Sequence, residues 1–153
     1  MGHKVIVVSD SHGRESLLYS IVQRELPFDC LIHCGDGVED ISDSNFPTQV
    51  RLLRVKGNMD RSYVNEMERT VITEICSRTV MITHGDLYGV NSGFGPILRE
   101  GRRIDADIVF FGHTHEKMIL EGKPALFNPG PANRGHYGVV TIGQQTNFTH
   151  KEI

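Results

Sequence analysis

The apolar positions of the N-terminal part predict a strand, a helix and two further strands. Residues 3–9 contain a near-continuous apolar run, which is typical of a strand covered on both faces. Residues 14–26 place apolar side chains at helical spacing, and Pro27 stops that pattern. Short apolar runs at 30–34 and 50–56 predict the next strands. This β-α-β order implies a parallel sheet flanked by helices.

The rest of the chain is richer in predicted strands. Residues 70–75 and 79–83 predict a hairpin, and three glycines with a proline predict a mobile loop at 88–96. A helix at about 96–103 and a buried strand at 108–111 follow, and 117–153 alternates short strands with turns. We therefore expect an α/β fold with a mixed sheet or two packed sheets, and one domain over residues 1–153.

Composition narrows the class of protein. A chain of 153 residues with 39% hydrophobic and 23% charged residues fits one ordinary globular domain. No secretory or membrane-spanning pattern occurs, which predicts a cytoplasmic protein without a membrane partner. Three cysteines without a C-x-x-C pair favour neither a disulfide framework nor a zinc knuckle. A net charge of −3 argues against stable nucleic-acid binding on a basic face, and self-association stays open.

Polar residues and glycine stand where five of the predicted strands end. The segments are Asp10-Ser11-His12-Gly13, Gly35-Asp36, Gly57-Asn58-Met59-Asp60, His84-Gly85-Asp86 and Gly112-His113-Thr114-His115. Taken singly, such pairs are usually turns. Because the carboxyl ends of parallel strands line one crevice, we expect all five segments to converge there.

The donor set in these segments predicts a metal centre. The seven candidate ligands are Asp10, His12, Asp36, Asn58, His84, His113 and His115. Oxygen and imidazole donors without sulfur suit Mn, Zn, Fe or Ni. Seven donors exceed one tetrahedral site, and with one bridging carboxylate they fit two divalent ions. We expect Asp10 with His12, and His113 with His115, to point the same way because residues i and i+2 share a face of an extended segment.

The other histidines are interpreted as structural. His3, His136 and His150 are expected at the surface or near the termini, and His33 within a strand. Arg14, directly after the first motif, is a candidate for contact with a substrate phosphate, although a surface position on the helix is the simpler interpretation.

The order of the five motifs resembles the calcineurin-like metallophosphoesterase superfamily. More narrowly, it is similar to the small single-domain bacterial and archaeal phosphodiesterases, which share their fold with the Vps29 subunit of retromer. The resemblance runs from Val5 to about Gly130 and implies a four-layer α/β/β/α sandwich with a dinuclear centre. It implies that one ion is held by Asp10, His12, Asp36 and His115, and the other by the bridging Asp36 with Asn58, His84 and His113.

One departure from the superfamily pattern bears on the substrate. Many members have a proton-donating histidine between the asparagine and aspartate of the third motif, and Met59 stands there. A thioether cannot donate a proton. We therefore expect phosphodiesters and good leaving groups to be hydrolysed better than alkyl monoesters, by a hydroxide held between two ions, with Mn²⁺ the expected metal.

The catalytic roles expected from motif and resemblance are as follows. Asp36, Asn58 and His113 hold metal and stabilise charge, and Asp60 or water replaces the missing proton donor. Arg14 and Asn58 are expected to contact the substrate, a small phosphodiester or a nucleotide.

Three other functions compete with this prediction. A non-catalytic metal-binding scaffold could use the same fold, as the resemblance to the retromer subunit suggests. A phosphomonoesterase or protein phosphatase is a second alternative. A metal-dependent amide hydrolase is disfavoured, because such enzymes are usually β/α barrels of around 250 residues.

Overall fold

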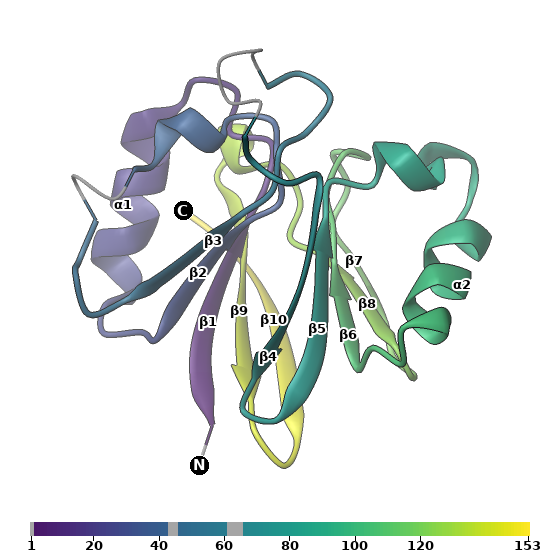
Figure 1. The fold of residues 1–153 in the computed structure, drawn as a ribbon. Coiled ribbons are helices and arrows are strands. Elements are labelled where there is room, and N and C mark those ends of the chain that lie inside the picture. The colour runs from purple at the N-terminus through teal and green to yellow at the C-terminus, as the bar shows by residue number, and fades with distance from the viewer. Residues whose placement is uncertain (1, 43–45, 61–65) are drawn as a thin grey trace.

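Two five-stranded sheets pack face to face in the computed structural model, which describes residues 2–42, 46–60 and 66–153. The first sheet has the order β10-β9-β1-β2-β3 and the second β4-β5-β6-β8-β7 (Figure 1). The strands are β1 (His3–Val8), β2 (Cys30–His33), β3 (Arg51–Arg54), β4 (Thr70–Ile75), β5 (Arg78–Thr83), β6 (Ile108–Phe110), β7 (Met118–Leu120), β8 (Ala125–Asn128), β9 (His136–Ile142) and β10 (Thr146–Glu152). The helices are α1 (Glu15–Glu25) and α2 (Gly95–Arg103), with short 3-10 turns η1 (Val38–Asp40), η4 (Asp86–Tyr88), η5 (Val90–Ser92) and η6 (Ala132–Arg134).

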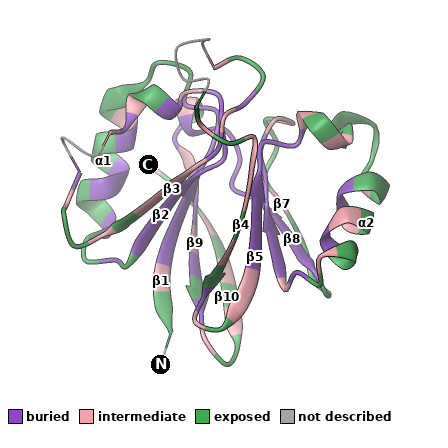
Figure 2. Cartoon of the chain, viewed as in Figure 1, coloured by how far each residue is buried: buried purple, intermediate pink, exposed green. Residues whose placement is uncertain are grey.

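The core consists of three apolar layers, and β1 shows why. Val5 and Val7 face the space between the sheets, while Ile6 and Val8 face α1. All four are fully buried, as the continuous apolar run predicts. A third layer lies between the second sheet and α2, so helices cover the two outer faces (Figure 2). The four-layer α/β/β/α prediction is confirmed.

Strand direction brings the functional loops to one end of the molecule. β1, β2 and β3 are parallel, and so are β5, β6 and β8. In Figure 1 these strands run upward in both sheets, and the loops that follow them meet at the top. The remaining strands pair antiparallel at the sheet edges or beside β1.

The predicted elements occur with boundaries shifted by one or two residues. The loop predicted at 88–96 is more ordered than its glycine content suggests. It contains a 3-10 turn, Val90 is buried, and the ring of Phe94 packs 5.8 Å from that of Phe111. Among the described residues, no helix is both long and apolar enough to cross a bilayer.

Candidate metal centre

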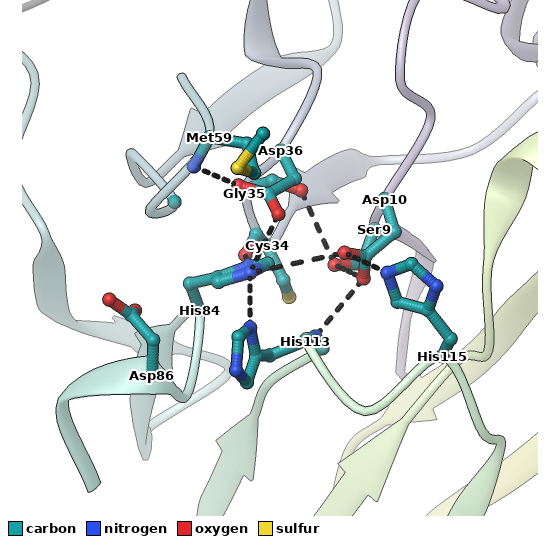
Figure 3. A network of polar contacts seen from close by, with 12 residues as sticks. Ser9, Asp10, Cys34, Gly35, Asp36, Met59, His84, Asp86, His113 and His115 are labelled. Atoms are coloured by element: carbon teal, nitrogen blue, oxygen red, sulfur yellow. Dashed lines mark hydrogen bonds and ion pairs between the residues drawn. The ribbon is translucent and has the colours of Figure 1, made fainter. Parts of the chain in front are cut away.

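Six of the seven predicted ligands come together at the carboxyl ends of β1, β2, β5 and β6. They form two groups in which the candidate ligand atoms all lie within 4.8 Å of one another. The groups are Asp10, His12 and His115, and Asp36, His84 and His113. Figure 3 shows His84 and His113 close to Asp36, with Asp10 and His115 beside them.

The first group is centred on the buried carboxylate of Asp10. Its Oδ2 accepts hydrogen bonds from Ser9 Oγ at 2.7 Å and from the backbone N–H of His113 at 3.1 Å. Its Oδ1 is buried and has no hydrogen-bond partner among the described residues. That oxygen lies 3.2 Å from Nε2 of His115 and 3.6 Å from Nε2 of His12. An unsatisfied buried carboxylate oxygen is costly, and a divalent cation between it and two imidazoles would satisfy it, so the residues fit a metal ion.

In the second group, hydrogen bonds hold Asp36 and His84 by one side-chain atom each and leave the other atom directed toward the site. Asp36 Oδ1 accepts the backbone N–H of Met59 at 2.8 Å, while Oδ2 lies 3.2 Å from His84 Nε2. His84 Nδ1 lies 2.8 Å from the carbonyl oxygen of Cys34, which fixes the ring with Nε2 toward the site. A metal-ligating histidine typically donates its other ring N–H to an oxygen, as Nδ1 of His84 does to Cys34 O. Nδ1 of His113 lies 3.2 Å from Nε2 of His84.

The two groups adjoin. His84 Nε2 lies 3.9 Å from Asp10 Oδ1, so it reaches both carboxylates. Burial alone would raise the pKa of Asp36 and lower that of His84, but their mutual hydrogen bond and charge, with Asp10 nearby, outweigh burial. The pKa of Asp36 is therefore below its usual value and that of His84 above it. Both shifts have the same meaning: the two carboxylates stabilise a positive charge placed between them, as a bound cation would be.

The ligand residues have an unusual backbone conformation. Positive φ angles occur at five of them: Asp10 (57°), His12 (44°), Asp36 (59°), His113 (71°) and His115 (60°). The left-handed region costs an L-residue about 1–2 kcal/mol. The expectation that the paired ligands point the same way through extended backbone is therefore wrong: Asp10 and His12 do lie in one group, but His113 and His115 lie in different groups. Strain gathered on one set of polar residues is typical of functional sites.

The turn after β3 approaches Asp36 very closely. A Cβ on Gly57 would lie 2.2 Å from Asp36 Oδ1, so only glycine fits there. Asn58, the seventh predicted ligand, is exposed, and within the described part of the chain its side chain makes no hydrogen bond to the other six. Asn58 directly follows Gly57, which approaches Asp36 closely, and its role as a metal ligand stays a prediction. Met59 is 67% exposed beside Asp36 (Figure 3).

Asp60 has a role that differs from the expected one. Its carboxylate accepts four backbone N–H bonds, at 2.7–3.2 Å, from Asp36, Gly37, Val38 and Gly57. Both oxygens accept backbone N–H groups, so the side chain joins two loops. Asp60 is therefore a positioning residue for Asp36.

Two buried side chains behind the site were missed as functional residues. His33, in β2 as predicted, bonds Ser11 Oγ through Nε2 at 2.9 Å and accepts the N–H of Gly35 at Nδ1. It thereby connects the first two motifs. The amide nitrogen of Asn128 donates to Gly112 O at 3.1 Å and Thr114 Oγ1 at 3.0 Å, on either side of His113. In the sequence, Asn128 is followed by Pro129 and Gly130, and this Asn-Pro-Gly turn is the signal that could have indicated the role.

Other predicted positions have mixed outcomes. Arg14 lies at the rim, where Nη1 donates to the carbonyl of Asn133 at 3.3 Å, and Asn133 N–H in turn bonds Asp10 O. His150 is not a simple surface residue, because its ring stacks 4.6 Å from that of Phe127 and its Nε2 lies 2.8 Å from Asn128 O.

Comparisons with known proteins identify the family. Residues 3–145 match the model of the calcineurin-like phosphoesterase superfamily domain. The chain belongs to this superfamily. It is 33% identical over 129 residues to "Probable metallophosphoesterase YsnB" of Bacillus subtilis, covering 82% of this chain and 73% of that one. Family and site together make the protein a metallophosphoesterase with two candidate metal-binding groups.

Solved structures support the same fold. A predicted phosphoesterase of Streptococcus pneumoniae superposes with a TM-score of 0.80 at 26% identity, covering 100% of this chain and 98% of that one. Vps29 of Entamoeba histolytica gives 0.75 at 16% identity, covering 98% and 99%. A protein described as a novel archaeal phosphodiesterase gives 0.69 at 19% identity, covering 97% and 99%.

Proposed function

We propose that this metallophosphoesterase hydrolyses small phosphodiesters, including nucleotide diesters, with two divalent ions, Mn²⁺ foremost. Ions at the two groups supply an activated water and neutralise charge on the phosphate when bound. The chain itself provides Asp10, His12 and His115 for one ion and Asp36, His84 and His113 for the other. Because the two groups adjoin, one phosphate could contact both ions.

The observation that carries the choice of diesters is the side chain at position 59. Met59 is exposed beside Asp36, and Asp60 is fully used as an acceptor by backbone N–H groups. Neither residue can protonate a departing alkoxide. A diester with a good leaving group needs no such proton, whereas an alkoxide leaving group, in an alkyl monoester or a nucleotide diester, would take its proton from water. The description of one structural relative as an archaeal phosphodiesterase agrees with this choice.

The positioning residues define what the chain contributes to orientation. Asp60 holds Asp36, Asn128 holds the loop of His113, and His33 with Ser11 joins the first two loops. Such support keeps ligands fixed while substrate enters. Arg14 donates to Asn133 O and would contact the phosphate on releasing that carbonyl.

The proposal is tested with the purified protein loaded with Mn²⁺, an aryl diester and an alkyl monoester. Bis(p-nitrophenyl) phosphate should be hydrolysed with a kcat/KM at least about tenfold above that of glycerol 2-phosphate, because only the alkyl leaving group needs a proton. Met59→His should narrow the ratio by raising activity on the monoester. Asp36→Ala should abolish both activities. The matched control is Asp105→Ala, because Asp105 is 87% exposed and precedes β6, at the opposite end of that strand.

Three outcomes decide the proposal. Preference for the diester supports it, and preference for the monoester contradicts it. Bound metal without hydrolysis of either ester would favour the non-catalytic scaffold.

A further inference from the structure

A second pocket opens beside the metal centre, on the side of the first ligand group. It has a volume of about 320 Å³ and is lined by His115, Glu116, Lys117, Pro131, Arg134 and His136. His115 belongs to both the pocket and the first ligand group, so the pocket adjoins the metal centre. Its size is sufficient for a phosphate group with its hydration.

The walls of the pocket are tied to the metal-binding loops. One wall is η6, in which the N–H groups of Ala132 and Asn133 donate to the carbonyl oxygens of Ser9 and Asp10 at 2.8 and 3.1 Å. The other wall, Glu116 and Lys117, directly follows the ligand His115. The pocket therefore keeps a fixed relation to the metal centre.

The two walls meet across a glycine. A Cβ on Gly130 would lie 3.0 Å from the Cβ of His136 and 3.3 Å from that of Lys117. The side chains of His136 and Lys117 are therefore neighbours. Because Gly130 has no side chain, the space between them stays open.

The charged side chains of the pocket are available to a ligand. Lys117 and Arg134 are exposed, and within the part of the chain that the structure describes neither has an ion-pair partner. The carboxylate of Glu152 lies near His136, with Oε1 3.3 Å from Nε2 of the ring, and does not pair with Lys117 or Arg134. Glu116 also lines the pocket, but it forms no ion pair with either cation. Although the net charge of the chain is −3, two cations without an ion-pair partner among the described residues, beside a centre for phosphate esters, favour an anion locally.

We propose that this pocket, the Lys117–Arg134 subsite, binds a second phosphate group of the substrate. The substrate class is then a phosphodiester that carries a further phosphate beyond the one that is cleaved, such as a nucleotide diester with a terminal phosphate. This inference rests on the proposed function for the identity of the cleaved group. Arginine and lysine are the side chains that bind exposed phosphates most often.

Direct binding tests the subsite separately from catalysis. Isothermal titration of the Mn²⁺-loaded protein compares thymidine 5′-monophosphate with thymidine 3′,5′-bisphosphate. The bisphosphate should bind about tenfold more tightly, because it adds two exposed charge pairs, each worth a few-fold in affinity. Lys117→Met with Arg134→Met should reduce the ratio of the two dissociation constants to about one. Glu116→Gln should increase it, since it removes the free acid of the pocket.

A matched control is Arg102→Met, which removes an exposed arginine on α2, a helix that does not line the pocket. It should leave the ratio as in the unaltered protein. Raising the salt concentration to 0.5 M should lower the ratio, because exposed charges are then screened.

Hydrolysis completes the test. Dithymidylate with a 5′-phosphate should show a lower KM than dithymidylate without it, and the double variant should lose that difference. Equal binding of the two thymidine phosphates by the unaltered protein would overturn the subsite. If the binding ratio is as expected but neither dinucleotide is cleaved, the proposed function fails while the subsite stands.

Discussion

His33 makes the stability of the protein depend on pH in a way that can be calculated. It is fully buried, and its Nδ1 accepts the N–H of Gly35 at 3.0 Å. The ring proton is therefore on Nε2, which donates to Ser11 Oγ at 2.9 Å. A second ring proton would have to replace the bond from Gly35. Burial lowers the pKa of His33 to about 4, although the carboxylates of Asp60, Asp10 and Asp40 act in the opposite direction.

The sign and size of the effect follow from that value. An unfolded histidine has a pKa of about 6.5, so between pH 6.5 and 4 the unfolded chain binds a proton at His33 that the folded chain does not. The stability that the neutral ring contributes is present above pH 6.5 and is lost as the pH falls toward 4. Between pH 7 and pH 5 the loss amounts to about 2 kcal/mol of unfolding free energy.

The assay is urea unfolding of the metal-free protein at pH 7 and pH 5, for the unaltered chain and for His33→Asn. The asparagine side chain can still accept the N–H of Gly35 but does not titrate. Other groups titrate in both proteins, including His84, whose pKa is raised, so the difference between the proteins isolates His33. The unaltered chain should lose about 2 kcal/mol more than the variant.

Equal loss in the two proteins would refute the reasoning. If His33→Asn does not fold, the ring of His33 can be titrated by NMR in the unaltered protein. Its C–H resonances should remain those of a neutral ring down to pH 5, and a midpoint near 6.5 would be equally contradictory.

Two further predictions concern the supports of the ligands. Asn128→Asp removes the donors to Gly112 O and Thr114 Oγ1, so metal affinity should fall about 10- to 100-fold in a chelator competition; unchanged affinity would show that the amide does not orient the histidine loop. Gly57→Ala would place a methyl group 2.2 Å from Asp36 Oδ1, which should lower unfolding free energy by about 1–3 kcal/mol and reduce bound metal, as urea unfolding and elemental analysis would report. Full metal content in that variant would contradict the close approach.

The architecture could be predicted from the sequence because a strand that is covered on both faces is apolar at every position. Val5 to Val8 are all apolar since β1 is covered by a sheet on one face and a helix on the other. Parallel strands then bring their following loops to one end, and so the motifs around Asp10, Asp36 and His113 could be expected to meet.

The supports of the site could not be predicted in the same way. Asp10 and His113 have positive φ angles and donate their backbone N–H groups to distant loops, at Gly35 O and Asp10 Oδ2, which no local pattern records. Asp60 looked like a proton donor because its motif neighbour Met59 cannot be one, whereas its carboxylate bonds backbone groups of a loop more than twenty residues away. His33 was placed correctly in a strand, but its partner Ser11 comes from another motif. Such roles depend on tertiary contacts.

The most direct test of the central claim is anomalous diffraction from crystals of the Mn²⁺-loaded protein. Two peaks should appear, one against Asp10, His12 and His115 and the other against Asp36, His84 and His113. Their separation should be roughly 3.5–4 Å, as in other two-metal hydrolytic sites. Anomalous density away from these six side chains, or a single ion bound by only one group, would contradict the account.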